Sequence, residues 1–304
     1  MRRMAWALPA VTLAVTACSV APAGTPPAAP RPASRPAASP VATPTTPATT
    51  EAPAAVAAAA DATVPPRLPH SPHGGPGRFA PTAPGVLDGK VVLVDPGHNG
   101  GNFSAPEIIN QLIWNGRESE TCDTTGAETD TGYTEAQFNW NVARYLTADL
   151  RAAGATVVLT RTSNTGTGPC VTQRAALGNQ AHASAAVSIH ADGGPPGGRG
   201  FAILEPVADG INNAIIGPSA RLGTDLRNAF AAGTGEPAST YDGINGIQPR
   251  DDLAGINLST VPKVFIECAN MRNPTDAALL TTPAWQAKAA RAIAAGLTTF
   301  LTHR

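Results

Sequence analysis

Charged side chains are scarce in this sequence. Lysine, arginine, aspartate and glutamate make up 14% of the 304 residues, and the formal net charge is -1. A protein that binds nucleic acid or an acidic membrane surface through charge alone needs a strongly basic patch, and this composition does not supply one. We therefore expect no nucleic acid among the partners of this protein.

Long hydrophobic runs are missing near the N-terminus. The apolar stretch behind the first arginines covers only residues 5–15, which is too short to span a bilayer stably. Its layout is typical of an export signal, which we place at residues 1–18. Val15 to Cys18 resembles a bacterial lipobox, in which Cys18 becomes the acylated N-terminus; alternatively, Cys18 lies in a discarded signal peptide. We expect an exported protein of the periplasm or cell wall, either secreted or lipid-anchored through Cys18.

Large apolar side chains are nearly absent from residues 19–84, where alanine, proline, threonine and serine predominate. Such a segment cannot bury enough surface to offset the entropy lost on ordering, so we predict a disordered linker. His70 and His73 lie in it and are expected to be exposed rather than to bind metal. Residues 85–304 remain as one folded domain. No repeat or isolated apolar stripe indicates self-association, so we expect a monomer.

Short, largely apolar segments recur along this domain, and they are typical of strands covered on both faces. They lie at residues 91–94, 156–160, 186–189, 201–204 and 263–266. Between them, apolar residues four apart from Phe138 to Leu150 predict a helix that begins at Thr134, which with Gln137 fits a capping box. Residues 220–230 and 284–301 are predicted to be further helices. The alternation predicts an α/β fold, a three-layer sandwich with a mostly parallel mixed sheet flanked by helices.

Three side chains with catalytic chemistry follow predicted strands directly. His98, His190 and Glu267 each stand at the carboxyl end of a strand, and Glu135 stands at the start of the first predicted helix. In parallel sheets the reactive groups gather beyond these strand ends. We therefore expect two imidazoles and a carboxylate at one edge of the sheet, with Glu135 opening onto the same edge.

Two histidines and a carboxylate are a common ligand set for catalytic zinc, with the fourth position left for water or substrate. We predict His98, Glu135 and His190 as Zn²⁺ ligands and Glu267 as the group that moves protons. Simpler interpretations stay open for each ligand. Glu135 could only complement a helix dipole, His98 could be a turn residue, and His190 a hydrogen-bonded strand end.

Several motifs in this order resemble the zinc-dependent N-acetylmuramoyl-L-alanine amidases, the amidase type 3 family. They are Asp95-Pro-Gly-His98-Asn-Gly, Glu135 with Asn139, Leu159-Thr-Arg161, Arg174 with Asn179, Ser188-Ile-His190-Ala-Asp192, and Phe265-Ile-Glu267 with Asn270 and Asn273. The resemblance implies the same α/β sandwich, the same zinc ligands and a catalytic Glu267. Gly-Arg199-Gly-Phe201 is shared with mycobacterial and related actinobacterial amidases. Many relatives carry asparagine where this chain has Asp192, which could alter substrate contacts or be a solvated loop residue.

The cysteines and a long polar segment complete the pattern. Three cysteines lie in the folded domain and cannot all pair. Cys122 and Cys170 lie in loops and are expected to form a disulfide, as in the related enzymes, whereas Cys268 in a buried strand is expected to be a core thiol. Residues 99–132 begin and end beside the predicted ligands. They could form a cleft wall or lid, as the resemblance implies, or a passive surface loop.

Some polar residues are assigned only supporting roles. Asp95 could orient a ligand imidazole, or it could be a turn residue before proline. Arg161 and Arg174 are expected to organise loops at the strand ends, and Arg250 and Asn257 to line a substrate groove.

The resemblance implies a substrate as well as a fold. It implies that residues 85–304 form a zinc amidase that hydrolyses the amide bond between N-acetylmuramic acid and L-alanine in peptidoglycan, for cell-wall turnover or cell separation. The partner is then peptidoglycan or a muropeptide. Two alternatives stay open, a zinc peptidase acting on stem peptides and a wall-binding module without catalytic activity.

Overall fold

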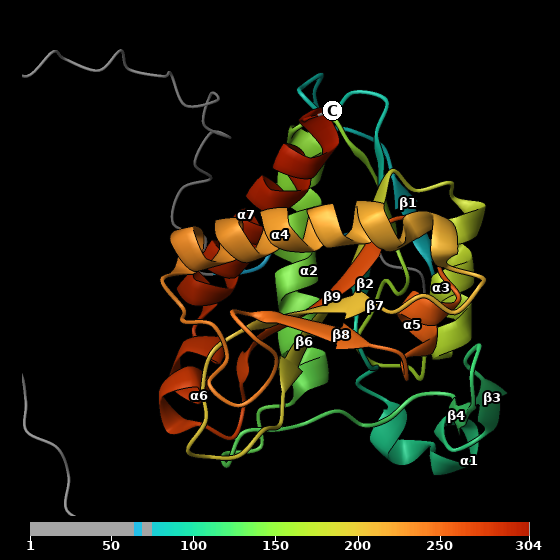
Figure 1. Cartoon of the computed structure of the whole chain (residues 1–304). Helices are drawn as coiled ribbons and strands as arrows, with labels where there is room; N and C mark the ends of the chain where they lie inside the picture. Colours follow the sequence, from blue (N-terminus) through green and yellow to red (C-terminus); the bar gives the residue numbers. More distant parts are fainter. Residues whose placement is uncertain (1–63, 69–74, 304) are drawn as a thin grey trace, which may run out of the picture. The chain divides into compact units, whose positions relative to one another are not determined.

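The computed structural model describes residues 64–68 and 75–303 (Figure 1). The predicted export signal, Cys18, His70, His73 and most of the predicted linker lie outside these residues. No helix in the described part of the chain is long and apolar enough to cross a membrane. The sheet begins before the predicted boundary at residue 85, because residues 77–79, which composition assigned to the linker, form an edge strand.

A seven-stranded mixed sheet runs through the centre of the domain, in the order β1-β5-β2-β6-β9-β7-β8. Its strands are β1 Gly77–Phe79, β2 Val91–Pro96, β5 Thr156–Leu159, β6 Ala185–Asp192, β7 Ala202–Pro206, β8 Ile247–Arg250 and β9 Lys263–Asn270. Neighbours from β5 to β9 are parallel, as are β7 and β8. The contacts of β1 with β5 and of β7 with β9 are antiparallel. The predicted α/β fold with a mostly parallel sheet is confirmed.

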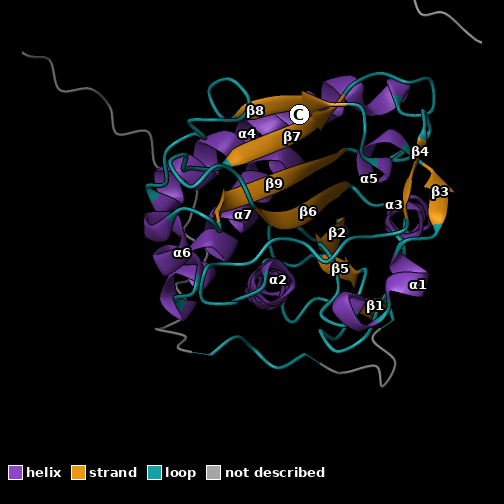
Figure 2. Cartoon of the chain, turned by 90° about the horizontal axis from the view of Figure 1, so that it is seen from below, coloured by secondary structure: helices purple, strands orange, loops and turns teal. Residues whose placement is uncertain are grey.

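Helices cover both faces of the sheet (Figure 2). One face carries α2 Glu135–Ala152, α4 Ile216–Thr234 and α7 Pro283–Thr302, and the other carries α3 Val171–Gln180 and α5 Ala254–Asn257. The short helix α6 Pro274–Leu280 follows β9. Alternate residues of β2 enter different cores: Val92 and Val94 pack in the larger one, and Leu93 packs in the core on the opposite face. Burial on both faces explains why the strands are continuously apolar.

The segment between the first two predicted ligands folds into small elements beside the sheet, at the lower right of Figure 1. They are the 3-10 turn η1 Asn102–Ser104, the helix α1 Pro106–Ile109 and a hairpin of β3 Leu112–Trp114 and β4 Ser119–Thr121. A second 3-10 turn, η2 Asn213–Ile215, precedes α4. Cys122 and Cys170 form the expected disulfide, and Cys268 is a free, buried thiol.

Candidate metal centre

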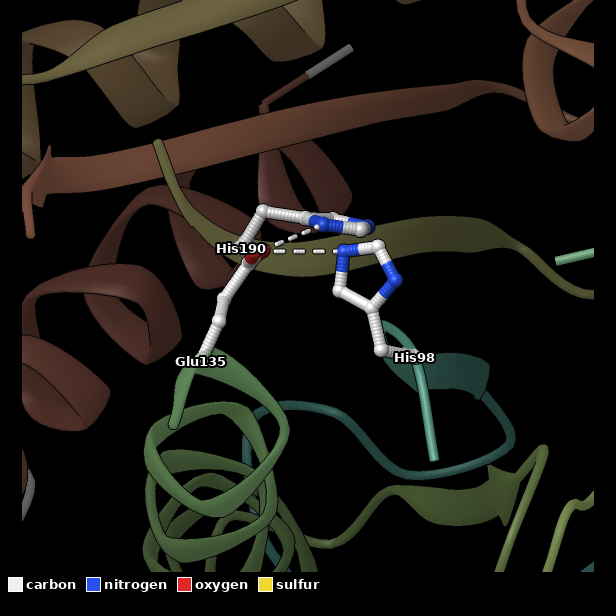
Figure 3. Close-up of side chains that lie close together, drawn as sticks. All are labelled: His98, Glu135 and His190. Carbon is white, nitrogen blue, oxygen red and sulfur yellow. Dashed lines mark hydrogen bonds and ion pairs between the residues drawn. The ribbon is translucent and has the colours of Figure 1, made fainter. Parts of the chain in front are cut away.

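His98, Glu135 and His190 come together at the carboxyl ends of the parallel strands (Figure 3). His98 lies in the turn after β2, Glu135 is the first residue of α2, and His190 lies near the end of β6. One donor atom from each lies within 4.8 Å of the other two. Glu135 stands between the imidazoles, with Oε2 3.2 Å from His98 Nε2 and Oε1 2.9 Å from His190 Nδ1. This group could hold a metal ion.

The start of α2 fixes the carboxylate of Glu135. The Thr134 side chain accepts a hydrogen bond from the amide of Gln137, as predicted, so the helix begins where the sequence indicated. The amides of Ala127 and Ala191 donate to Glu135 Oε2 and Oε1 over 2.8 and 3.2 Å. A carboxylate that is 5% exposed is costly unless donors or charges meet it, and here both do.

The charges at this site favour a cation. Burial alone would lower the pKa of His98, but the carboxylates of Glu135 and Asp123 outweigh burial and raise that pKa to about 10. Burial conversely raises the pKa of Glu135, yet the two histidines hold it well below its usual range. The surroundings of the site therefore stabilise positive charge, which a bound metal ion would supply.

Two glycines allow the backbone to approach the site closely. A Cβ atom at Gly97 would lie 2.1 Å from the ring of His190. A Cβ atom at Gly126, where φ is +75°, would lie 2.7 Å from His98 Cδ2 and 2.8 Å from Glu135 Oε2. The ring of Phe265 stacks in parallel on the ring of His190, with ring centroids 5.1 Å apart. Gly97 and Phe265 therefore both lie directly against His190, and Gly126 lies against His98.

Asp123 is one of two residues near the site that sequence reasoning missed. His98 Nδ1 lies 3.3 Å from Asp123 Oδ1 and 3.2 Å from the carbonyl oxygen of Thr124. Asp95, the candidate that the sequence offered for this role, instead contacts Thr160, Ser188, Arg174 and Lys263 and neither histidine. The expectation that Asp95 orients a ligand imidazole by contacting it directly is therefore wrong.

The two arginines organise the turn that carries His98, as expected. Arg174 donates to the carbonyl oxygens of Pro96 and His98 over 2.8 and 3.0 Å. Arg161 donates to the carbonyl oxygens of Pro96 and Gly97 over 3.0 and 3.2 Å. Both side chains are buried, so the turn is held by buried charged donors.

Glu267 stands directly opposite His190 in the register of β6 and β9. It lines a cleft of about 280 Å³ together with His98, Glu135 and His190. Its Oε2 atom is buried and has no hydrogen-bond partner among the described residues. Burial first, and then the negative charges of Glu135 and Asp192, raise the pKa of Glu267 well above its usual range.

Asp192, Tyr241 and Arg250 line a pocket together with Glu267. His98 and Arg250, which both line the cleft of about 280 Å³, lower the pKa of Glu267 and so oppose the effect of burial and of the two carboxylates. Asp192 lies at the end of β6 rather than in a solvated loop, and Tyr241, which sequence reasoning also missed, hydrogen-bonds to it. Asn257 is fully buried and donates to the carbonyl of Asp251, so it supports the neighbouring loop instead of lining the groove.

Comparison with known proteins places this geometry in a family. The family model described as N-acetylmuramoyl-L-alanine amidase matches residues 92–299. An N-acetylmuramoyl-L-alanine amidase of Mycobacterium tuberculosis is 38% identical over 223 residues, which are 73% of this chain and 90% of that protein.

Two solved structures, both of the N-acetylmuramyl-L-alanine amidase Ami1, support the same assignment. The structure from Mycobacterium smegmatis is 42% identical with a TM-score of 0.67, covering 71% of this chain and 98% of the other. The apo form from Mycobacterium abscessus is 39% identical with a TM-score of 0.67, covering 71% and 100%. This chain therefore belongs to the N-acetylmuramoyl-L-alanine amidase family and is an enzyme of that class.

Proposed function

We propose that this protein is a zinc-dependent amidase that hydrolyses the bond between N-acetylmuramic acid and L-alanine in peptidoglycan. His98, Glu135 and His190 would hold the ion, and Glu267 would be the catalytic residue. The observation that carries the proposal is the placement of a partly buried Glu267, with one oxygen free of partners among the described residues, in the same cleft as the three ligands. This is the arrangement expected of an open, catalytic metal site.

The side chains divide the chemistry between them. Zinc, when bound, would supply a water molecule whose pKa is lowered to about 7 and would polarise the carbonyl under attack. Glu267 would take a proton from the attacking water and give a proton to the leaving amine of L-alanine. Its raised pKa suits a group that must hold a proton between these steps. His98 and Arg250 oppose that rise and would keep the carboxylate able to release the proton again.

The biological role follows from the substrate. We propose that the enzyme acts in cell-wall turnover or daughter-cell separation after export. Residues 1–18 would be the signal, and residues 19–84, apart from the edge strand β1 at Gly77–Phe79, would be a linker to the wall-facing domain. Mass spectrometry of the mature N-terminus would distinguish a lipid anchor on Cys18 from free secretion. Native mass spectrometry of the purified protein should give a monomer.

The direct test is product analysis. Purified protein is incubated with muramyl dipeptide and with longer muropeptides, with and without a chelator, and the products are identified by mass spectrometry. A new amine on L-alanine, lost with chelator and restored by zinc, is the expected result. Cleavage between two amino acids would instead indicate a stem-peptide peptidase, and intact muropeptides with zinc present would indicate a wall-binding module. The Glu267→Gln variant controls for contaminating amidase.

A further inference from the structure

His98 is the one candidate ligand that lies outside a helix or strand. Glu135 belongs to α2 and His190 to β6, but His98 lies in the turn beyond β2. Its φ is +54°, a left-handed conformation that is strained for a residue other than glycine. Because strain of this kind persists only where the surroundings impose it, other groups must hold His98 in place.

Three consecutive residues provide that support, and we name Cys122, Asp123 and Thr124 the strap. Both Asp123 Oδ1 and the Thr124 carbonyl oxygen lie within hydrogen-bond distance of His98 Nδ1. Accepting the Nδ1 proton leaves Nε2 of His98 free, and Nε2 is the nitrogen that faces Glu135 (Figure 3). Carboxylates and carbonyls that receive the second proton of a metal-binding histidine fix both its tautomer and its orientation.

The strap is itself held from the side of His98. Asn99 donates to Asp123 Oδ2 over 2.8 Å, and Asn102 donates to the Thr124 carbonyl over 2.6 Å. Asp123 is 3% exposed at its side chain, and burial, which would raise its pKa, is outweighed by Arg174 and His98, which hold that pKa below its usual value. The Asp123 carboxylate therefore faces His98 from a buried position that Asn99 and Arg174 fix.

The disulfide joins the strap to helix α3, which also contacts the turn that carries His98. Cys122 is bonded to Cys170, the residue that caps α3, and the amide of Val171 donates to the Cys122 carbonyl over 2.8 Å. One helical turn further along α3, Arg174 reaches both Asp123 Oδ2 at 3.3 Å and the carbonyl of His98 at 3.0 Å. The strap is thus fixed to the helix that also fixes the histidine turn.

We infer that Asp123 is a positioning residue for His98 and that the Cys122–Cys170 bridge acts through Asp123 to set the metal affinity of the site. The inference rests on the proposed function only in assigning His98 to a metal ion. The bridge alone fixes the strap covalently to α3, so without it Asp123 is held by non-covalent contacts. The free energy needed to align His98 would then be taken from metal binding.

The test measures zinc binding rather than turnover. Zinc dissociation constants are determined by competition with a chromophoric chelator for the wild type, for Asp123→Asn and for Cys122→Ser/Cys170→Ser. Loss of a group that orients a metal-binding histidine typically weakens affinity by about 10- to 100-fold, and we expect that range for both variants. In Asp123→Asn, the side-chain oxygen can accept from Arg174 only if the NH₂ group points toward His98 Nδ1. An NH₂ group there cannot accept the Nδ1 proton, so it would favour the wrong tautomer, the one with the proton on Nε2.

A combined variant separates positioning from simple loss of stability. The triple variant combines Asp123→Asn with Cys122→Ser and Cys170→Ser. Because the bridge is inferred to act through Asp123, this variant should lose no more zinc affinity than Asp123→Asn alone. If the two effects were independent, their fold-losses in affinity would multiply. Absorption of the cobalt-loaded proteins should change in the same variants, since it reports ligand geometry. Glu118→Gln removes a carboxylate from an exposed position of the same insert and should bind zinc as the wild type does.

Each result has a defined meaning. Zinc dissociation constants of Asp123→Asn and of the cysteine variant equal to that of the wild type would overturn the inference. If the fold-losses in zinc affinity multiply in the triple variant, the inference that the bridge acts through Asp123 would be overturned. If the cysteine variant does not fold in urea-unfolding controls, Asp123→Asn with its cobalt spectrum still decides the role of Asp123. A wild type that binds no zinc would instead reject the proposed function.

Discussion

The backbone of Gly97 lies directly against the imidazole ring of His190. Any side chain at position 97 would place its Cβ atom 2.1 Å from Cε1 of that ring. Phe265 also stacks on this ring in parallel, with ring centroids 5.1 Å apart, so a displaced ring would lose that contact. The glycine that follows Asp95 and Pro96 is therefore required by the approach of two strands, in addition to any need of the turn itself.

Gly97→Ala should displace His190 and weaken zinc binding. We expect a loss of about 10- to 100-fold in zinc affinity, because the ligand can no longer reach its position without moving the backbone. Chelator competition measures the effect. Gly166→Ala is the matched control, since a Cβ atom there meets no heavy atom within 4 Å. Equal zinc affinity in both variants would show that His190 can move at no cost.

Glu267→Gln should separate activity from stability. Removing the proton-transfer group should lower turnover of muramyl dipeptide by about 10²- to 10⁴-fold. Because the folded-state pKa of this carboxyl is raised, the folded protein binds its proton more tightly than the unfolded chain does. The stabilisation that the carboxyl provides is present below the unfolded pKa of about 4.3 and is lost as the pH rises through the folded pKa.

The metal-free Gln variant should therefore be more stable than the metal-free wild type at pH 8, and the difference should shrink toward pH 5. Urea unfolding at both pH values measures this. A wild type as stable as the variant at pH 8 would contradict the burial argument. Retention of turnover would contradict the catalytic one.

The convergence of the ligands was predictable because it depends on strand direction and on little else. His98, His190 and Glu267 each follow a continuous apolar run, and parallel strands bring such ends to one edge. Thr134 marked the start of α2 by its capping pattern. Local chemistry was therefore enough to place the four main side chains of the site.

Other features depended on contacts that no local pattern carries. β1 is a three-residue edge strand behind a proline-rich tract, and only its pairing with β5 defines it. β8 contains Pro249, which is tolerated because the strand lies at the other edge. Asp123 meets His98 only because the insert folds back, and its position next to Cys122 in the sequence does not by itself predict that contact.

Asp95→Asn should destabilise the domain even though Asp95 contacts neither candidate histidine. Its carboxylate is 1% exposed and pairs with Arg174 at 2.8 Å and with Lys263 at 3.0 Å. Burial raises the pKa of Asp95, but the two cations outweigh burial and hold it well below its usual range. Removing one partner of a buried ion pair leaves uncompensated charge and costs about 3–5 kcal/mol.

The pH dependence of that loss has a defined sign. A depressed carboxyl pKa contributes stability above the unfolded pKa of about 3.9, and the contribution is lost as the pH falls toward the folded pKa. The difference in the free energy of unfolding between wild type and Asp95→Asn should therefore be full at pH 7 and should become smaller below pH 4. Thermal unfolding of metal-free protein across this range measures it, and a gap that does not depend on pH would reject the ion-pair account.

Glu120→Ala tests whether the insert at residues 99–132 shapes the cleft. Glu120 Oε1 accepts a hydrogen bond from the amide of Ala254 over 3.0 Å, next to Leu253, which lines the cleft with Glu267. Losing one such bond, worth about 1–1.5 kcal/mol, should lower kcat/KM for muramyl dipeptide by about 5- to 10-fold. Zinc affinity should not change, because Glu120 does not contact His98.

The matched control is Glu118→Ala, which removes a carboxylate from the exposed tip of the same hairpin. Its kcat/KM should equal that of the wild type. If Glu120→Ala also turns over substrate like the wild type, the hairpin of β3 and β4 is a passive surface element of the insert. A fall in kcat/KM at constant zinc affinity would instead indicate that the insert forms a wall of the cleft. The metal site would then be intact, and only the loop that carries Leu253 would have moved.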